Sequence, residues 1–77
     1  MDPAKALRLI GFYLERAGEP TFKVQAFRKA AAIVDELPDE EVQLRARRGS
    51  LTQLSGIGKT TAAVISDAVA GKEPAYL

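Results

Sequence analysis

The segment Leu54-Ser55-Gly56-Ile57-Gly58-Lys59-Thr60 constrains the fold of this chain more than any other segment. Two glycines enclose one apolar residue between two apolar stretches, so the chain can turn sharply and then enter a helix. We expect Gly56 and Gly58 to adopt positive φ and Ile57 to turn inward and anchor the turn. The amides of Gly56, Gly58 and Lys59 would then be unpaired at a helix start, where partial positive charge accumulates. Such an arrangement binds phosphate.

A phosphate site of this kind reads no base, because its hydrogen bonds go to the backbone of the ligand. The alternative is a plain helix–helix turn that needs glycines for steric reasons alone. The match between the turn and the following helix start favours the phosphate site. Lys59 directly follows the turn, so its ammonium group can add a charge contact to the amides.

The sequence Gly58-Lys59-Thr60 also suggests a nucleotide-binding P-loop. That motif needs a glycine five positions before Gly58, but position 53 is Gln53. No hydrophobic strand precedes the turn, and a chain of 77 residues cannot supply the sheet that carries such sites. We therefore exclude nucleotide hydrolysis at this turn.

The pattern outside the turn is helical throughout, which predicts an all-α fold of four or five short helices. Apolar residues recur at spacings of three and four, and glycine or proline separates the segments. The expected helices are at about 3–17, 22–36, 39–48 and 59–70, with one short apolar turn at 51–54.

Local signals mark the helix boundaries. Asp2 precedes a first-turn proline, and Thr21 is the expected N-cap of the second helix. The third helix begins with Asp39-Glu40-Glu41 and ends with three arginines, an order that matches the helix dipole. The residues expected to face the core are Leu7, Ile10, Leu14, Ala17, Val24, Phe27, Ala31, Val34, Ala62, Ile65 and Val69.

Length and composition limit the classes of function. Residues 1–77 are enough for one small domain, and the sequence leaves open that they are a fragment of a longer protein. The absence of cysteine and histidine excludes disulfides, thiolate zinc sites and the commonest general base. No apolar run approaches the ~20 residues of a membrane helix. We expect a cytoplasmic protein, nucleoid-associated if bacterial, with no membrane partner.

The net charge of +1 conceals an uneven distribution. Residues 35–41 hold five acids, which leaves five acids against eleven bases elsewhere, so the rest of the surface is positive. Arg28 and Lys29 either extend a basic surface or form an ordinary solvated helix face. The arginines at the end of the third expected helix either compensate the helix dipole or contact phosphates beside the turn. They are Arg45, Arg47 and Arg48. The aromatic residues expected to pack in the core or at its rim are Phe12, Tyr13 and Phe22.

Two segments together resemble a known family. Residues 51–65 resemble a helix-hairpin-helix motif, with Ser55 where proline is usual. Residues 22–31 resemble the matching segment of the small N-terminal domain of family X DNA polymerases. The resemblance covers nearly the whole chain and is strongest to the version that precedes a polymerase-and-histidinol-phosphatase (PHP) type phosphoesterase domain in bacterial proteins. It implies an all-α, SAM-like fold with one helix-hairpin-helix motif.

The resemblance implies a function in DNA repair. It implies sequence-independent binding of DNA, with gapped or nicked DNA as the candidate preferred forms, and the targeting of an attached catalytic domain. Lys23 and Phe27 match the residues that the family uses around a 5′-phosphate at a gap, although Phe27 lacks the hydroxyl of the usual tyrosine. The expected DNA-binding residues are Gly56, Ile57, Gly58, Lys59, Thr60, Lys23 and Phe27. A monovalent cation, K⁺ or Na⁺, is the one cofactor implied, held by the backbone carbonyls of Thr52, Leu54 and Ile57.

One departure from the family concerns catalysis. Some members remove a 5′-deoxyribose phosphate through a lysine Schiff base, and Val64 occupies that position here. We therefore expect a binding module and no enzyme. Two alternatives stay open: a protein-interaction module that has lost DNA binding, and a lyase that uses Lys59 or Lys23.

Overall fold

The computed structural model describes residues 1–74, and this part of the chain is all-α, as expected. No helix within it combines the length and the apolar character that crossing a membrane requires. Its elements are α1 (Pro3–Arg16), α2 (Thr21–Glu36), α3 (Asp39–Arg48), the 3₁₀ turn η1 (Leu51–Gln53) and α4 (Lys59–Val69).

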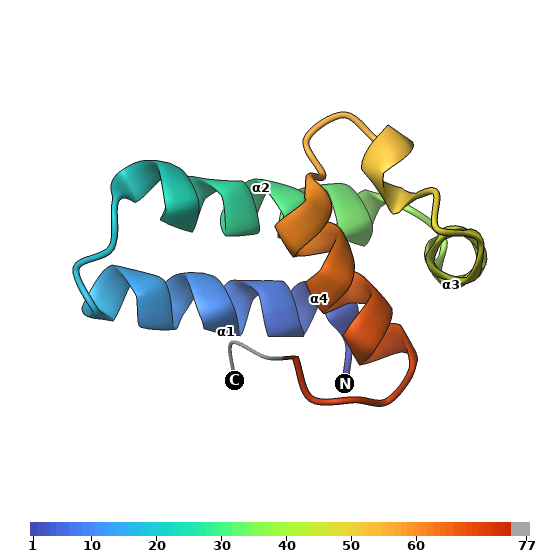
Figure 1. The fold of residues 1–77 in the computed structure, drawn as a ribbon, viewed down its shortest axis with the longest axis horizontal. Coiled ribbons are helices and arrows are strands. Elements are labelled where there is room, and N and C mark those ends of the chain that lie inside the picture. The colour runs from blue at the N-terminus through green and yellow to red at the C-terminus, as the bar shows by residue number, and fades with distance from the viewer. Residues whose placement is uncertain (75–77) are drawn as a thin grey trace.

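The helices are arranged around one antiparallel pair (Figure 1). α1 and α2 lie side by side in opposite directions, and α4 crosses both of them. α3 lies beyond the end of the pair where α2 finishes, and it contacts η1 and α4. The segment 54–58, which we call the hairpin, joins η1 to α4 and packs against α2 through Gly56.

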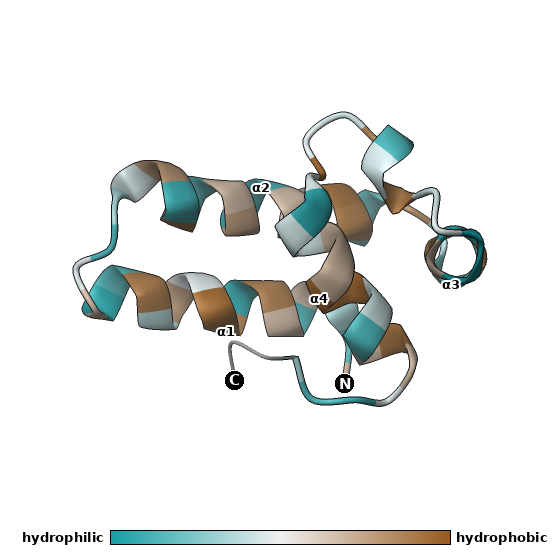
Figure 2. Ribbon diagram, viewed as in Figure 1, coloured by the Kyte–Doolittle hydropathy of each residue, from teal (hydrophilic) through white to brown (hydrophobic). Residues whose placement is uncertain are grey.

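The core lies between α1, α2 and α4. Figure 2 shows α3 as the most hydrophilic helix, whereas the other three carry apolar faces. Most of the residues expected to face the core do so, but Ala17 is exposed because α1 ends at Arg16. The buried members of the expected set are Leu7, Ile10, Val24, Phe27, Ala31, Val34 and Ile65, with Leu14, Ala62 and Val69 partly buried.

The helix ends follow from local chemistry, with one exception. The Asp2 carboxylate accepts a hydrogen bond from the Lys5 amide at 2.9 Å, which confirms the expected cap. Gly49 ends α3 with φ 70°, a left-handed conformation that glycine adopts at low cost. The expected cap at Thr21 is wrong, because Pro20 occupies the N-cap position and Thr21 is already helical.

The aromatic side chains Phe12, Tyr13 and Phe22 were expected in the core or at its rim, and the structure excludes the core for all three. Their exposed fractions are 48%, 51% and 71%. The Phe12 ring lies against Tyr13 at a centroid distance of 5.7 Å, and the Arg16 guanidinium lies 5.6 Å from the Phe12 centroid. The core between α1 and α2 is filled instead by aliphatic and small residues and by one aromatic residue, Phe27.

Candidate functional site

The first hairpin glycine, Gly56, is required by packing and by backbone conformation. Its φ is +93°, a region that residues with a side chain rarely adopt. A Cβ placed on Gly56 would lie 2.6 Å from Ile33 Cδ1 and 3.1 Å from Lys29 Cε. The absence of a side chain therefore lets the hairpin lie directly on α2.

The second hairpin glycine, Gly58, is not required by packing or by backbone conformation. The expectation of positive φ is wrong here, because its φ is −96° and its ψ is −174°, extended values that any residue adopts. A Cβ at Gly58 would meet no heavy atom of the described residues within 4 Å. Nothing in the fold requires a glycine at this position, so the space in front of it is available to a ligand.

The hairpin amides divide into paired and unpaired groups. The Ile57 N–H donates to the Leu54 carbonyl at 3.1 Å, and Ile57 is 4% exposed, so it anchors the turn as expected. The Gly58 N–H donates to Thr61 Oγ1 at 3.0 Å, and the Thr61 hydroxyl donates back to the Gly58 carbonyl at 3.2 Å. The expectation that the Gly58 amide is unpaired is therefore wrong.

The amides that follow Gly58 remain available. Lys59 and Thr60 are the first two residues of α4, and both are exposed. Within residues 1–74, neither of their amides, nor that of Gly56, has a hydrogen-bond acceptor. Gly58 has no side chain that could accept a hydrogen bond from these amides. Their partial positive charge therefore faces the open space in front of Gly58.

A pocket of about 250 Å³ lies beside these amides, and we call it the hairpin pocket. It brings together most of the residues expected to bind DNA, although they are separated in sequence. α1 and α2 contribute an apolar wall, and the hairpin and the start of α4 contribute the polar side. The lining residues are Leu14, Phe22, Lys23, Ala26, Phe27, Gly56, Gly58, Lys59, Thr60 and Thr61.

Three of the four α2 residues that line this pocket differ in exposure. Lys23 is half exposed, and its ammonium group lies 3.6 Å from a Glu19 carboxylate oxygen. Phe27 is 4% exposed, so its ring belongs to the core as well as to the pocket wall. Phe22 is largely exposed beside Lys23 and was not expected in the site, since a single aromatic residue at a helix start carries no sequence signal for it.

The carbonyls expected to hold a monovalent cation lie along η1 and the hairpin. The Leu54 carbonyl accepts the Ile57 amide and has a second lone pair. The Thr52 and Ile57 carbonyls accept no hydrogen bond from the described backbone outside the helices. Carbonyl oxygens are ligands that hard cations prefer. The bound cation itself remains a prediction.

Val64, at the position of the family's lyase lysine, is 3% exposed and belongs to the core cluster. Ile65 and Ala68 of the same helix belong to that cluster as well. An apolar, buried residue offers neither an amine nor access for a Schiff base.

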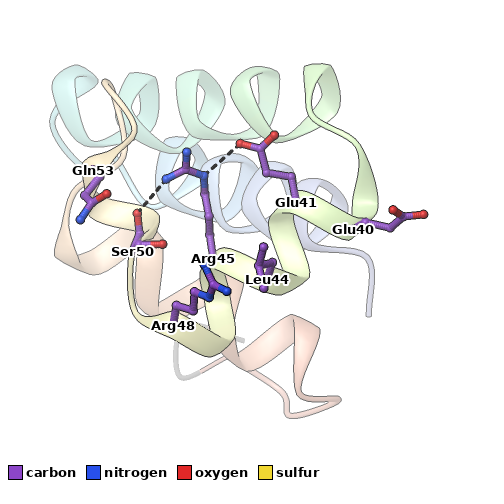
Figure 3. Close-up of a pocket in the computed structure, with 7 residues that line it drawn as sticks. All are labelled: Glu40, Glu41, Leu44, Arg45, Arg48, Ser50 and Gln53. Carbon is purple, nitrogen blue, oxygen red and sulfur yellow. Dashed lines mark hydrogen bonds and ion pairs between the residues drawn. The ribbon is translucent and has the colours of Figure 1, made fainter.

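A second, larger pocket of about 590 Å³ lies between α3 and η1 (Figure 3). Arg45 crosses it: its Nε donates to Glu41 Oε2 at 3.0 Å and its Nη1 donates to the Ser50 carbonyl at 3.4 Å. The Ser50 amide donates in turn to the Arg45 carbonyl at 3.0 Å. Arg45 therefore holds η1, and with it the entry to the hairpin, against α3.

Comparison with known proteins agrees with this geometry. Residues 1–73 match the family described as "Helix-hairpin-helix domain". Over 66 residues the chain is 38% identical to the DNA polymerase/3'-5' exonuclease PolX of Bacillus subtilis (strain 168). The matched segment covers 86% of this chain but only 11% of that relative, and no solved structure matches significantly. The family match spans η1, the hairpin and α4, and the chain belongs to the helix-hairpin-helix domain family, with distant similarity to PolX.

Proposed function

We propose that this domain binds DNA through the phosphate backbone without sequence preference. The observation that carries the proposal is the start of α4, where two unpaired amides, Lys59 and Thr60, face open space in front of Gly58. An anionic oxygen there would receive two charge-assisted hydrogen bonds and the attraction of the helix dipole. Lys23 and Lys59 add positive charge from two helices at the same pocket.

The chemistry of the hairpin pocket favours the phosphate backbone over the bases. Its donors are main-chain amides and lysine ammonium groups, which contact phosphates without reading sequence. Among the described residues that line it there is no Arg, Asn or Gln, which are common readers of base edges. The domain should therefore bind different sequences with equal affinity.

The apolar wall of the hairpin pocket supports a preference for interrupted DNA. Phe22 is 71% exposed next to the phosphate site, and Leu14, Ala26 and Phe27 extend the apolar surface. A nucleotide at a gap or nick is unstacked on one side, so its sugar or base can lie against such a wall. Continuous duplex offers no such group. We infer that a 5′-phosphate at a gap is bound more tightly than intact duplex.

The relative suggests why such a module is useful. PolX of Bacillus subtilis is named as a polymerase and exonuclease, and the matching segment is a small part of it. We propose that the domain delivers an attached catalytic domain to DNA, with a PHP-type phosphoesterase as the candidate. According to this proposal, the domain itself catalyses no reaction.

A salt titration tests the proposal. The affinity for short duplexes and for gapped DNA with and without a 5′-phosphate is measured between about 50 and 200 mM salt. Contacts from Lys23 and Lys59 predict a log–log slope of about −2 or steeper on duplex DNA, and a Kd in the ~10⁻⁴–10⁻⁶ M range. Equal affinity for unrelated sequences is also expected.

Other outcomes of the same titration would point elsewhere. Binding without a salt-dependent slope, or no binding, would contradict the proposal and favour a protein-interaction module. A borohydride-trapped adduct on an abasic substrate would instead indicate lyase chemistry through Lys59 or Lys23, for which we expect no product.

A further inference from the structure

We propose that Lys29 is a third phosphate-binding lysine of this domain, placed beside Gly56 and outside the hairpin pocket. The inference rests on the proposed function and deepens it. Together with Lys59, Lys29 would let the hairpin contact two successive phosphates of one strand.

The position of Lys29 is fixed by packing on the hairpin. Its Cε would lie 3.1 Å and its Cδ 3.6 Å from a Cβ placed on Gly56, and Ile33 flanks the same glycine. The aliphatic part of the side chain therefore covers the bare face of the turn. A carbon–nitrogen single bond is about 1.45 Å long. The Lys29 ammonium group must therefore lie within about 5 Å of that Cβ position, beside the hairpin backbone.

Lys29 is also unpaired, unlike its neighbours on α2. Lys23 pairs with Glu19, and Arg28 pairs with Glu15 at 3.0 Å. In the part of the chain that the structure describes, Lys29 makes no ion pair with any carboxylate. Its charge is available to a ligand without breaking an internal contact.

The hairpin has cations both in the hairpin pocket and beside it. Lys23 and Lys59 line the hairpin pocket, together with Gly56 and Gly58, whereas Lys29 does not line it. Gly56 lines the pocket and also lies next to the Lys29 stem, so Lys29 is a neighbour of the pocket that does not line it. A strand that places one phosphate at the start of α4 would therefore bring a neighbouring phosphate past Gly56 toward Lys29, since successive phosphates of one strand rise by only about 3.4 Å along the duplex axis.

This arrangement lowers the cost of binding. A lysine side chain that is mobile in solution loses conformational freedom when a ligand immobilises it, and this loss weakens binding. Packing of the Lys29 stem on Gly56 restricts that freedom before DNA arrives. Lys29 is thus preorganised, which a solvated lysine on a helix face is not.

The substitution Lys29→Met tests the inference, because methionine keeps an unbranched apolar stem on Gly56 and removes only the charge. The control is Lys5→Met, which removes one exposed lysine from α1, outside both pockets near the hairpin. On duplex DNA we expect Lys29→Met to make the salt slope less steep by about 0.9 and to weaken binding about eightfold at 0.1 M salt. Lys5→Met should leave the slope unchanged.

The result separates this inference from the proposed function. A wild-type protein with no salt slope would overturn both. A normal wild-type slope that Lys29→Met leaves intact would overturn the role of Lys29 alone. If Lys29→Met lowers the melting temperature, Lys29→Gln and Lys29→Arg give the same test: the first must reduce the slope and the second must keep it.

Discussion

Replacing Gly58 with serine should make the domain more stable and should weaken its DNA binding. Gly58 is the N-cap residue of α4, its backbone is extended, and a Cβ there meets no described atom within 4 Å. A serine fits this position without strain, and its hydroxyl would accept a hydrogen bond from the amide of Thr60 or Thr61. The Thr60 amide is one of the two that we assign to the DNA phosphate, and the Thr61 amide follows it in the same turn.

The expected gain in stability is small but measurable. A serine cap exceeds a glycine cap by a few tenths of a kcal/mol, and losing a glycine restricts the unfolded chain by a further ~0.4–1 kcal/mol. The total of about 0.7–1.4 kcal/mol corresponds to a rise of about 3–11 °C in melting temperature for a domain of this size. The Gly58 amide keeps its own acceptor, Thr61 Oγ1, in the variant.

The expected loss of binding is larger. A hydrogen bond to a charged group contributes about 1.5–3 kcal/mol, so an amide occupied by the introduced serine weakens binding tenfold or more. Thermal unfolding by circular dichroism gives the stability, and fluorescence anisotropy with labelled duplex gives the affinity. Gly58→Ala is the control, because it adds a Cβ without an acceptor and should weaken binding less than the serine.

Stability and affinity must move in opposite directions for the reasoning to hold. If Gly58→Ser raises the melting temperature and binds DNA as tightly as the wild type, the phosphate does not lie at the start of α4. If the substitution destabilises the domain by more than about 1 kcal/mol, Gly58 does not face open space.

Three further predictions concern the surroundings of the hairpin. Gly56→Ala should cost about 1–3 kcal/mol of stability in thermal unfolding, because φ is +93° and the added methyl meets Ile33 Cδ1 at 2.6 Å. Arg45→Met should cost about 1 kcal/mol in urea unfolding, because η1 loses its hydrogen bond to α3 at Ser50. Borohydride trapping on an abasic substrate should give no adduct, whereas an adduct abolished by Lys59→Gln would refute the assignment as a binding module.

The helices were predictable because their signals are local. The Asp2 cap, the glycine after α3 and the acid-first order of α3 each depend on residues within one or two turns. Periodicity then identified most of the core. The same reasoning failed for Phe12 and Phe22, since an amphipathic pattern cannot tell an exposed aromatic residue from one at the rim of the core.

The site was predictable only in outline. The hairpin amides followed from the two glycines, but the sequence could not distinguish their roles. Gly56 is required by contact with Lys29 and Ile33 on another helix, and Gly58 by nothing inside the fold. The capture of the Gly58 amide by Thr61 depends on a side-chain rotamer, and the position of Lys29 depends on how the hairpin packs on α2.

The most direct test of the phosphate site is an NMR titration of the ¹⁵N-labelled domain with gapped DNA that carries a 5′-phosphate. We predict the largest amide shifts at Lys59 and Thr60, a smaller shift at Gly58, whose amide already bonds Thr61, and saturation that weakens as salt rises. Shifts that cluster on α1 or α3 while the amides of Lys59 and Thr60 stay unchanged would contradict the account.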